Sequence, residues 1–380
     1  MWKEYRFSDF AAVNSSIKLK KGEVYSFVEM KDLSDGQKFC APNQERELAG
    51  GSRFQNGDTL FARITPCLEN GKICQVRDLK NDVGFGSTEF HVFRGKENVS
   101  DTDFIFYLSR WDEVRNFAEM NFDGTSGRQR VPKEAFDNLY LTLPTLPEQK
   151  AIAEVLSSLD DKIDLLHQNN QTLEQLAETL FRKWFVEEAE ESWEEKGLDE
   201  ISDFLNGLAC QKYPVKPNEI GLPVIKIKEM RTGITDASDW ATSDIPEKYI
   251  IEQGDMLFSW SGSLDIVLWF GEKGVLNQHL FKVTSENYPQ WFYYFWTQHH
   301  LKEFKGIADD KATTMGHIQR HHLSEAKVVV PSEEELEQIG KEISPYFEKL
   351  KSNTAQIKTL QTLRDSLLPK LMSGEVRIEM

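Results

Sequence analysis

Residues 144–185, PTLPEQKAIAEVLSSLDDKIDLLHQNNQTLEQLAETLFRKWF, decide how this chain folds. Apolar or marked residues recur in this stretch at steps that alternate between four and three. They are Ile152, Leu156, Leu159, Ile163, Leu166, Asn170, Leu173, Ala177, Leu180 and Trp184. Such spacing, kept for about five heptads, is typical of the a and d positions of a coiled coil. Because an apolar stripe of this kind cannot bury itself, the pattern predicts a long helix with a partner helix.

A second copy of the pattern occupies residues 330–371, VPSEEELEQIGKEISPYFEKLKSNTAQIKTLQTLRDSLLPKL. Its seam positions are Ile339, Ile343, Tyr346, Leu350, Asn353, Ile357, Leu360, Arg364, Leu367 and Leu371. Each follows its counterpart by 187 residues (339 minus 152, 371 minus 184). We therefore predict two long helices that pair antiparallel within the chain. The residues expected to pair them are Ile163, Leu166, Asn170, Leu173, Leu180, Leu350, Asn353, Ile357, Leu360 and Leu367.

Two further features bear on these helices. Ser157 and Ser344 occupy equivalent places, and Pro345 follows the second. Because a Ser cap followed by Pro typically starts a helix, we expect a break at this point and then a helix of roughly 26 residues. Each seam also holds one Asn. Of two registers, the one that places Asn170 opposite Asn353 (170 plus 353, or 523) is preferred over a sum of 530, because a buried amide pair satisfies itself.

Length and composition bound the class of protein. With 380 residues and a mass of 43.9 kDa, the chain is expected to form two or more domains. No apolar run approaches the roughly 18 residues that a membrane helix needs, and the start, MWKEYRFSDF, is unlike a signal or transit peptide. The four cysteines form no C-x-x-C pair and have no zinc-like histidine spacing. We therefore expect reduced thiols and a cytoplasmic location.

The formal net charge of −17 excludes a generally basic nucleic-acid-binding protein. The charge is uneven, however, because acidic residues gather at 187–200 and 333–337. Basic residues recur elsewhere, among them Arg63, Arg128, Arg130, Arg231 and Arg320. A local DNA-binding face therefore remains compatible with the composition.

The segments that precede the two helices also repeat. Residues 1–147 are predicted to form short strands and turns around a helical stretch at 103–120, and residues 191–332 repeat that order. The run GDTLF at 57–61 matches GDMLF at 254–258, an offset of 197 (254 minus 57). In this alignment, residues 314–320 fall where the loop at 125–131 falls. The side chains of the two blocks mostly differ, which suggests one task on two targets.

The predicted fold class is accordingly α+β. Two related domains, residues 1–147 and 191–332, are each followed by a helical segment, residues 148–190 and 333–380. The two long antiparallel helices would give the tandem repeat a pseudo-two-fold arrangement.

The sequence carries none of the catalytic motifs that we sought. It has no P-loop, no G-x-G-x-x-G after a strand, no H-E-x-x-H and no Asp/Asn-Pro-Pro-aromatic motif of amino-group DNA methyltransferases. Adjacent histidines occur at His299-His300 and His321-His322, but neighbouring residues point to different sides of a helix or strand. We therefore predict no catalytic residues and no metal site.

Two loops, Gly124–Arg130 and Thr313–Arg320, combine Gly, Ser and Thr with Arg. Such loops offer backbone N–H groups, hydroxyls and a bidentate guanidinium to phosphates and guanine edges. A solvated turn is the alternative interpretation, and for Trp260 the alternatives are stacking on a base and filling a core. The candidate DNA-contacting residues are Arg63, Arg128, Gln129, Arg130, Trp260, Ser261, Gln319, Arg320 and His321.

Three runs resemble the conserved regions of the specificity subunits of type I restriction-modification systems. They are LPTLPEQKAIAEVLSSLDDKID, LAETLFRKWFVE and LRDSLLPKLMSGEVRI. The order of recognition domain and helix, occurring twice, covers essentially the whole chain, and GDTLFAR and GDMLFSW look like the strand that recurs in the family's recognition domains. The resemblance does not transfer base-contacting residues, because these motifs are structural.

The resemblance implies a subunit without catalysis or cofactors of its own, which reads a bipartite, asymmetric site in double-stranded DNA. It also implies two methyltransferase subunits, carrying S-adenosylmethionine, docked on the helices, and motor-nuclease restriction subunits that use ATP and Mg. The helices would then act as a ruler between the half-sites. Two alternatives stay open on the residues alone: a scaffold with two ligand-binding domains on a coiled-coil stalk, and a hydrolase with an unrecognised carboxylate pair.

Overall fold

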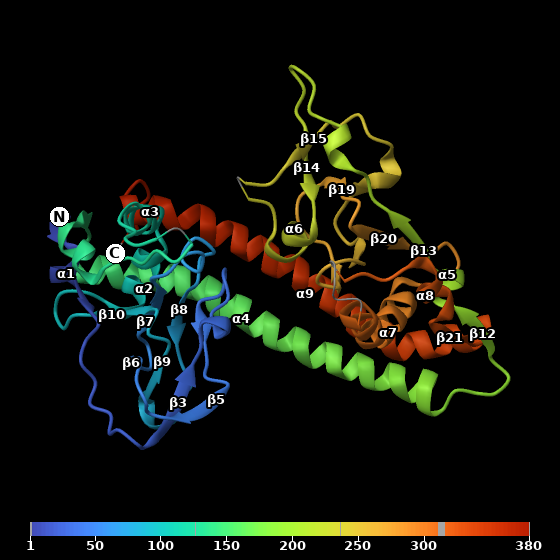
Figure 1. The fold of residues 1–380 in the computed structure, drawn as a ribbon, viewed down its shortest axis with the longest axis horizontal. Helices are drawn as coiled ribbons and strands as arrows, with labels where there is room; N and C mark the ends of the chain where they lie inside the picture. Colours follow the sequence, from blue (N-terminus) through green and yellow to red (C-terminus); the bar gives the residue numbers. More distant parts are fainter. Residues whose placement is uncertain (1, 126, 236, 311–315, 380) are drawn as a thin grey trace. The chain divides into compact units, whose positions relative to one another are not determined.

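The computed structural model describes residues 2–125, 127–235, 237–310 and 316–379. The chain divides into two compact units: unit 1 comprises residues 1–165 and 359–380, and unit 2 comprises residues 166–358. Each unit contains one block of strands and helices together with part of each of two long helices (Figure 1). This mixed content confirms the predicted α+β class. None of the helices in the described ranges is long and apolar enough to cross a membrane.

Among the described residues, the block of unit 1 contains three sheets. Their strand orders are β2-β10-β7-β8-β4, β5-β3-β9-β6 and β1-β11. The strands are β1 (Lys3–Arg6), β2 (Ala11–Val13), β3 (Val24–Val28), β4 (Phe39–Cys40), β5 (Gln44–Glu47), β6 (Ser52–Gln55), β7 (Thr59–Ala62), β8 (Ile73–Val76), β9 (Val83–Gly86), β10 (Phe90–Gly95) and β11 (Tyr140–Leu143). The helical elements are α1 (Phe7–Phe10), η1 (Met30–Asp32), η2 (Lys80–Asp82), α2 (Thr102–Arg110), α3 (Asp112–Met120) and η3 (Lys133–Asn138).

The main core of this block lies between the first sheet and its helices. All four residues of β7 are buried, and Phe61 contacts Phe93 and Phe136 at ring distances of 5.1 and 6.0 Å. Helix α2 begins at a cap in which the Asp101 carboxylate accepts a hydrogen bond from the Phe104 N–H at 3.0 Å. It then buries a continuous run, residues 104–109. The helical stretch predicted at 103–120 is thus two helices, which meet at Trp111.

In the part of unit 2 that the structure describes, the block also contains three sheets, ordered β13-β20-β17-β18, β15-β14-β19-β16 and β12-β21. The strands are β12 (Glu194–Gly197), β13 (Asp203–Asn206), β14 (Leu222–Ile225), β15 (Trp240–Ala241), β16 (Ile250–Ile251), β17 (Met256–Ser259), β18 (Asp265–Leu268), β19 (Gly274–Leu276), β20 (Leu280–Thr284) and β21 (Lys327–Val330). The helical elements are α5 (Leu198–Ile201), η5 (Cys210–Lys212), α6 (Ile227–Thr232), η6 (Glu247–Tyr249), α7 (Gln290–Asp310) and α8 (Arg320–Glu325).

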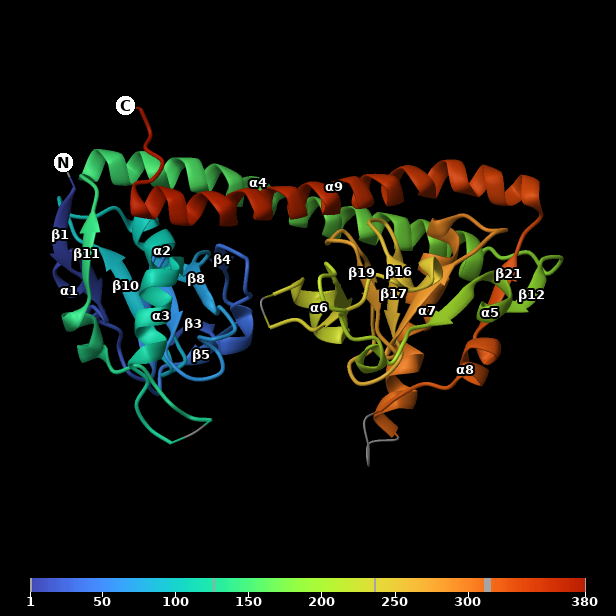
Figure 2. The ribbon, with the colours of Figure 1, turned by 90° about the horizontal axis from the view of Figure 1, so that it is seen from above.

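The two blocks share one topology. Every strand of unit 2 has a counterpart in unit 1, and β4 is the strand of unit 1 that has none among the described residues. Even the parallel pair recurs, because β3 runs parallel to β9 as β14 does to β19. Figure 2 shows strands of each block, among them β3, β8 and β10 in unit 1 and β16, β17 and β19 in unit 2. The tandem repeat predicted from short matched runs is therefore confirmed at the level of the fold.

The long helices α4 (Leu146–Arg182) and α9 (Glu333–Ser373) are each uninterrupted, and a π-helical turn, η4 (Lys183–Glu187), follows α4. The predicted break at Ser157 and Ser344 is therefore wrong. Pro345 removes one hydrogen bond inside α9. Its neighbours Ile343 and Phe347 are both fully buried in the core of unit 2. This packing outweighs the missing hydrogen bond, because tertiary burial contributes most of a helix's stability.

The helices run antiparallel within each unit. In unit 2, the Asn170 side-chain amide donates to the Thr354 hydroxyl at 3.1 Å and the Trp184 ring N–H donates to Glu342 at 3.1 Å. The partner's number on α9 therefore falls as the number along α4 and η4 rises. In unit 1, Leu156 of α4 shares a core with Leu368 of α9, and Asp160 four residues on contacts Arg364, so the order is the same. Figure 1 shows the paired segments side by side.

The register differs by one residue from the preferred prediction, because Asn170 meets Thr354 (170 plus 354, or 524) and not Asn353. The predicted amide pair is wrong. Asn353 is fully buried, and neither polar atom of its amide has a partner among the described residues. Thr354, whose hydroxyl donates to the Leu350 carbonyl at 2.8 Å, instead offers its oxygen to Asn170. All ten residues predicted to pair the helices are buried or half-buried.

Candidate functional site

The first candidate surface forms where the chain leaves β7. Residues 63–65 pair antiparallel with residues 129–131: Ile64 lies opposite Arg130, the Thr65 N–H donates to the Gln129 carbonyl at 3.0 Å, and the Val131 N–H donates to the Arg63 carbonyl at 2.8 Å. Asp123 and Arg130 exchange two further backbone hydrogen bonds, of 2.9 and 2.8 Å, which close the loop between them. We call this paired segment, with the loop 123–130 and Glu89 beside it, the first platform.

Its arginines are not equivalent. The Arg130 guanidinium donates to both carboxylate oxygens of Glu89, at 2.7 to 3.0 Å, and this contact raises the pKa of Arg130. Arg128 is exposed, and its side chain makes no hydrogen bond or ion pair with any described residue. The half-buried Arg63 has an Nε without a partner among these residues. Two of the three guanidinium groups therefore have hydrogen-bonding capacity left for a ligand.

Unit 2 repeats the same backbone pattern where the chain leaves β17. Ser261 lies opposite His317, the Gly262 N–H donates to the Gly316 carbonyl at 2.8 Å, and the Ile318 N–H donates to the Trp260 carbonyl at 3.0 Å. We call the paired segments 260–262 and 316–318, with His279 beside them, the second platform. By this pairing, Trp260 replaces Arg63 (260 minus 63, or 197) and His317 replaces Arg130 (317 minus 130, or 187).

The third position follows from strand register. Ala62 pairs with Phe90 in unit 1, and Ser259 pairs with Leu280 in unit 2. The residues that precede Phe90 and Leu280, Glu89 and His279, are therefore equivalent. The sequence around Glu89 and around His279 carries no pattern that marks these residues, because only the pairing of distant strands brings them to the platforms.

The side chains of the second platform form an aromatic and imidazole cluster. The Trp260 ring lies 6.1 Å from that of His279 and 6.3 Å from that of His317, and its N–H donates to the Asn206 side-chain oxygen at 3.0 Å. The Ser261 hydroxyl lies 3.0 Å from Nδ1 of His279. Where the first platform holds an ion pair, the second therefore holds half-buried rings with imidazole and hydroxyl hydrogen-bonding groups.

Comparison with known proteins assigns the family. A family model described as the type I restriction modification DNA specificity domain matches residues 1–175 and again residues 190–362. The chain belongs to this family. It is a DNA-specificity subunit of a type I restriction-modification system, and the two matches each begin with one of the two blocks.

Individual relatives agree with this assignment. The subunit is 24% identical over 467 aligned residues to the specificity subunit of the type I restriction enzyme HindI of Haemophilus influenzae, with 99% of each chain covered. It is 31% identical over 205 residues to the EcoEI specificity subunit of Escherichia coli. This alignment covers 50% of the present chain and 34% of the EcoEI subunit. The crystal structure of the S subunit from M. genitalium has the same fold, with a TM-score of 0.52, 17% identity and coverage of 100% and 97%.

Three candidate residues of the specificity subunit lie elsewhere than the sequence alignment placed them. That alignment set Arg320 beside Val131, but the backbone pairing makes Ile318 the counterpart of Val131. Gln319 precedes α8, and Arg320 and His321 lie on α8, whose counterpart in unit 1 is η3. Arg320 donates to the Phe204 carbonyl at 3.2 Å.

The loops predicted at Gly124–Arg130 and Thr313–Arg320 are described only in part. Ser126 and residues 313–315 lie outside the described residues. Within the described part, Gly124 and Gly127 have φ angles of 114° and 79°, a backbone conformation that favours glycine. No described atom lies within 4 Å of a Cβ built on Gly127, so the tip of this loop is open.

His321, His322 and Glu325 come close enough to suggest a metal site, because their ligand atoms lie within 4.8 Å of one another. The contacts of His322 point to another role. Its Nδ1 accepts a hydrogen bond from the Gln319 N–H at 3.0 Å, which places the ring proton on Nε2 and leaves no lone pair there for a metal. The arrangement fits the start of α8.

Proposed function

We propose that the two platforms read the two halves of a bipartite, asymmetric site in double-stranded DNA. Residues 1–147 and 191–332 are the recognition domains of this proposal. The observation that carries it is the recurrence of the same three backbone contacts in both blocks with different side chains on them. A fixed backbone with variable side chains suits one docking geometry on two base sequences.

On the first platform, Arg128, Arg63 and Gln129 supply the contacts. An arginine donates two parallel hydrogen bonds to a guanine, and a glutamine pairs in the same way with an adenine. Arg128 lies on an open glycine loop and has no partner among the described residues. Glu89 holds Arg130 at the base of the loop, so Arg130 orients the loop and does not compete for the same base.

On the second platform, Trp260, Ser261, His279 and His317 supply the contacts. Imidazole nitrogens and a hydroxyl can each donate to or accept from a base edge or a phosphate. Gln319 caps the adjoining helix α8, which begins with Arg320 and His321, and the exposed His321 can reach a phosphate. This mixture of indole, hydroxyl and imidazole groups differs from the guanidinium groups of the first platform, so the two half-sites differ in sequence.

The paired helices are proposed to bind two methyltransferase subunits. Large apolar residues of α4 and α9 stay exposed in a single chain: Val155, Leu165, Leu176 and Leu363 are 37% to 48% exposed. Leu165 and Leu176, eleven residues apart, lie on the same face of α4. In this proposal, catalysis and the cofactors S-adenosylmethionine, ATP and Mg belong to the methyltransferase and restriction subunits of a cytoplasmic complex.

Co-purification tests the docking surface. Leu165→Glu with Leu176→Glu should abolish recovery of co-expressed methyltransferase subunits, because the two substitutions place charge in an apolar contact. Val24→Glu is the matched control, since Val24 is 59% exposed but lies on β3, in the block. Equal recovery with the helix variant and the control would reject this surface.

A gel shift tests the choice between DNA reading and a scaffold. The full-length chain, with and without methyltransferase subunits, is titrated against duplexes that carry both half-sites or one. Tightest binding to the intact bipartite duplex supports the proposal. Equal binding to all duplexes, or none with either preparation, would favour the scaffold.

A further inference from the structure

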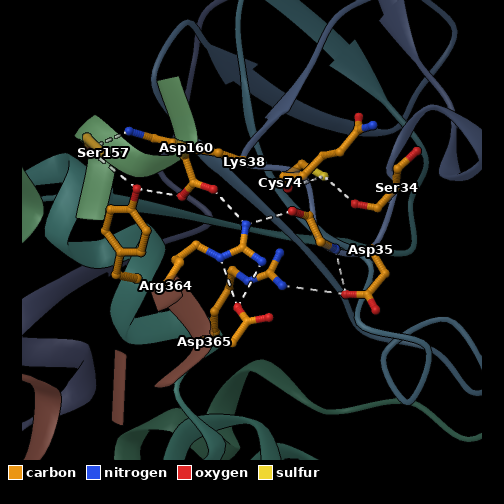
Figure 3. Close-up of polar contacts among 12 residues, drawn as sticks. Ser34, Asp35, Lys38, Cys74, Ser157, Asp160, Arg364 and Asp365 are labelled. Carbon is orange, nitrogen blue, oxygen red and sulfur yellow. Dashed lines mark hydrogen bonds and ion pairs between the residues drawn. The ribbon is translucent and has the colours of Figure 1, made fainter. Parts of the chain in front are cut away.

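A buried ion pair joins the two long helices in unit 1. Arg364 of α9 donates to the Asp160 carboxylate of α4 at 2.6 Å, and the two side chains are 4% and 2% exposed. The second carboxylate oxygen of Asp160 accepts from the Tyr107 hydroxyl of α2 at 2.7 Å. Figure 3 shows Asp160 and Arg364 facing each other.

The surroundings complete the pair. Arg364 also donates to the Gly36 carbonyl at 2.7 Å and to the Asp365 carboxylate at 2.9 Å. Beside it, the buried Lys38 donates to the Ser157 hydroxyl at 2.8 Å (Figure 3). The network thus depends on α9 for its arginine and on α4 for its central carboxylate, and neither helix alone satisfies it.

The same crossing in unit 2 is apolar. The repeat of 187 residues makes Phe347 the counterpart of Asp160 (347 minus 160) and Ala177 the counterpart of Arg364 (364 minus 177). Phe347 and Ala177 are 0% and 1% exposed and belong to one core. Phe347 packs on Tyr294 of α7 at a ring distance of 5.1 Å. At this layer, the helix pair therefore holds an ion pair in unit 1 and apolar side chains in unit 2.

Because α4 and α9 are copies of one pattern, α4 could also pair with the α4 of a second copy of the chain. In the observed register, Asp160 would then meet Ala177 of that copy, since Ala177 stands where Arg364 stands in α9. A methyl group cannot compensate a buried carboxylate, and the mismatch would occur twice in such a dimer. Removing one partner of a buried ion pair is strongly destabilising.

We propose that the Asp160–Arg364 pair makes α4 select the α9 of its own chain over the α4 of a second copy. Buried polar groups have this role at single seam positions of coiled coils, where they fix the partner at a cost in stability. The inference stands on the helix pairing and does not depend on DNA. If the proposed function holds, its consequence is that each helix pair joins one first platform to one second platform.

The experiment uses two full-length copies of the chain with different affinity tags, co-expressed and purified through both tags. The test variant combines Asp160→Phe with Arg364→Ala, which installs the residues of unit 2 in unit 1. We expect its mixed dimers to be about tenfold more abundant than those of the wild type by native mass spectrometry. Asp160→Leu with Arg364→Leu, measured alongside, should behave in the same way and guards against a folding defect of one variant.

The matched control is Leu156→Phe with Leu368→Ala, an apolar change in a nearby layer of the same core. It should form no more mixed dimer than the wild type. Asn169→Cys, added to each variant, identifies the pairing. If α4 pairs with the α4 of the second copy, residue 169 lies opposite Gln168 of that copy, and the two introduced cysteines are close enough to cross-link the copies. If α9 is exchanged instead, residue 169 lies near Ala355, and the cysteines do not meet. A mixed fraction within about twofold of the wild type in both test variants, an equal rise in the control, or dimers without the cross-link would overturn the proposal.

Discussion

Arg130 and Glu89 form a two-point ion pair at the base of the first platform, with the shortest contact at 2.7 Å. The two residues come from distant parts of the chain and meet because β10 pairs with β7. Their pairing fixes the end of the loop that carries Arg128. The two arginines therefore have different roles: Arg130 orients the loop, and the side chain of Arg128 has no partner in the described structure.

The first prediction concerns Arg128. Arg128→Ala should weaken binding of the assembled methyltransferase to its cognate DNA by about 1–3 kcal/mol, because it removes the unpaired guanidinium of the platform. Titration of labelled duplex at fixed salt measures the change. Arg6→Ala removes the same charge at an exposed site paired with Asp9 and should leave the affinity unchanged. Equal affinities for Arg128→Ala and the wild type would remove this loop from the interface.

The second prediction concerns Glu89. Glu89→Gln should release Arg130 and remove a negative charge, so binding to non-cognate DNA should tighten and depend more steeply on salt. One added phosphate contact changes the slope of log affinity against log salt by about 0.9. Measurement at four salt concentrations gives this slope. A slope identical to that of the wild type would show that Arg130 does not reach the DNA backbone.

The third prediction concerns His91, which is fully buried on β10. Its Nε2–H donates to the Val131 carbonyl at 2.8 Å, next to the first platform. Burial lowers its pKa from 6.5 to about 4, so folding favours the neutral ring. The neutral ring therefore makes a contribution to the free energy of unfolding that is fully present above pH 6.5 and is lost as the pH falls toward 4. The maximum loss is about 3 kcal/mol, from 1.36 kcal/mol per pKa unit.

Urea denaturation between pH 7 and pH 4.5 tests this effect. His91→Gln keeps a side-chain N–H for Val131 but cannot titrate, so its stability should fall less with acidification than that of the wild type. Parallel losses in the two proteins would show that other groups cause the acid sensitivity of unit 1.

The fourth prediction concerns Arg364. Arg364→Ala should lower the free energy of unfolding by roughly 3–5 kcal/mol, because it leaves the buried Asp160 without its counter-charge. Lys341→Ala, which breaks an exposed pair with Glu337, should cost less than about 1 kcal/mol. Chemical denaturation measures both. A loss below that of the surface control would mean that Tyr107 alone satisfies Asp160.

The fifth prediction tests the helices as a ruler. Seven residues inserted after Gln168 and seven after Ala355 keep the heptad pattern and the pairing, because Gln168 lies opposite Gln356 and Asn169 lies opposite Ala355 (both sums are 524). The insertion adds about 10 Å at 1.5 Å per residue. The gap between half-sites should therefore widen by about three base pairs at 3.4 Å each. Mapping of methylated sites measures the gap, and an unchanged gap would end the ruler hypothesis.

Periodicity predicted the seams of the helices well, because a long apolar stripe has few solutions other than a paired helix. The break predicted beside Pro345 does not occur, because the burial of Ile343 and Phe347 stabilises the helix more than the proline destabilises it. Glu89 and His279 could not be found from spacing, since strand pairing brings them to the platforms. The alignment of Arg320 failed because the offset between the blocks falls from 197 at Trp260 to 187 at His317, and loops of unequal length hide that change.

The central claim is that one backbone platform, built twice, reads two different half-sites. Sequencing of methylated DNA tests it most directly, with methyltransferase assembled on the wild type, on Arg128→Ala and on Trp260→Ala. The account predicts that each variant relaxes the base preference in one half of the bipartite motif, a different half for each, and leaves the other half and the gap intact. Motifs that stay unchanged in both variants, or that relax in the same half, would contradict it.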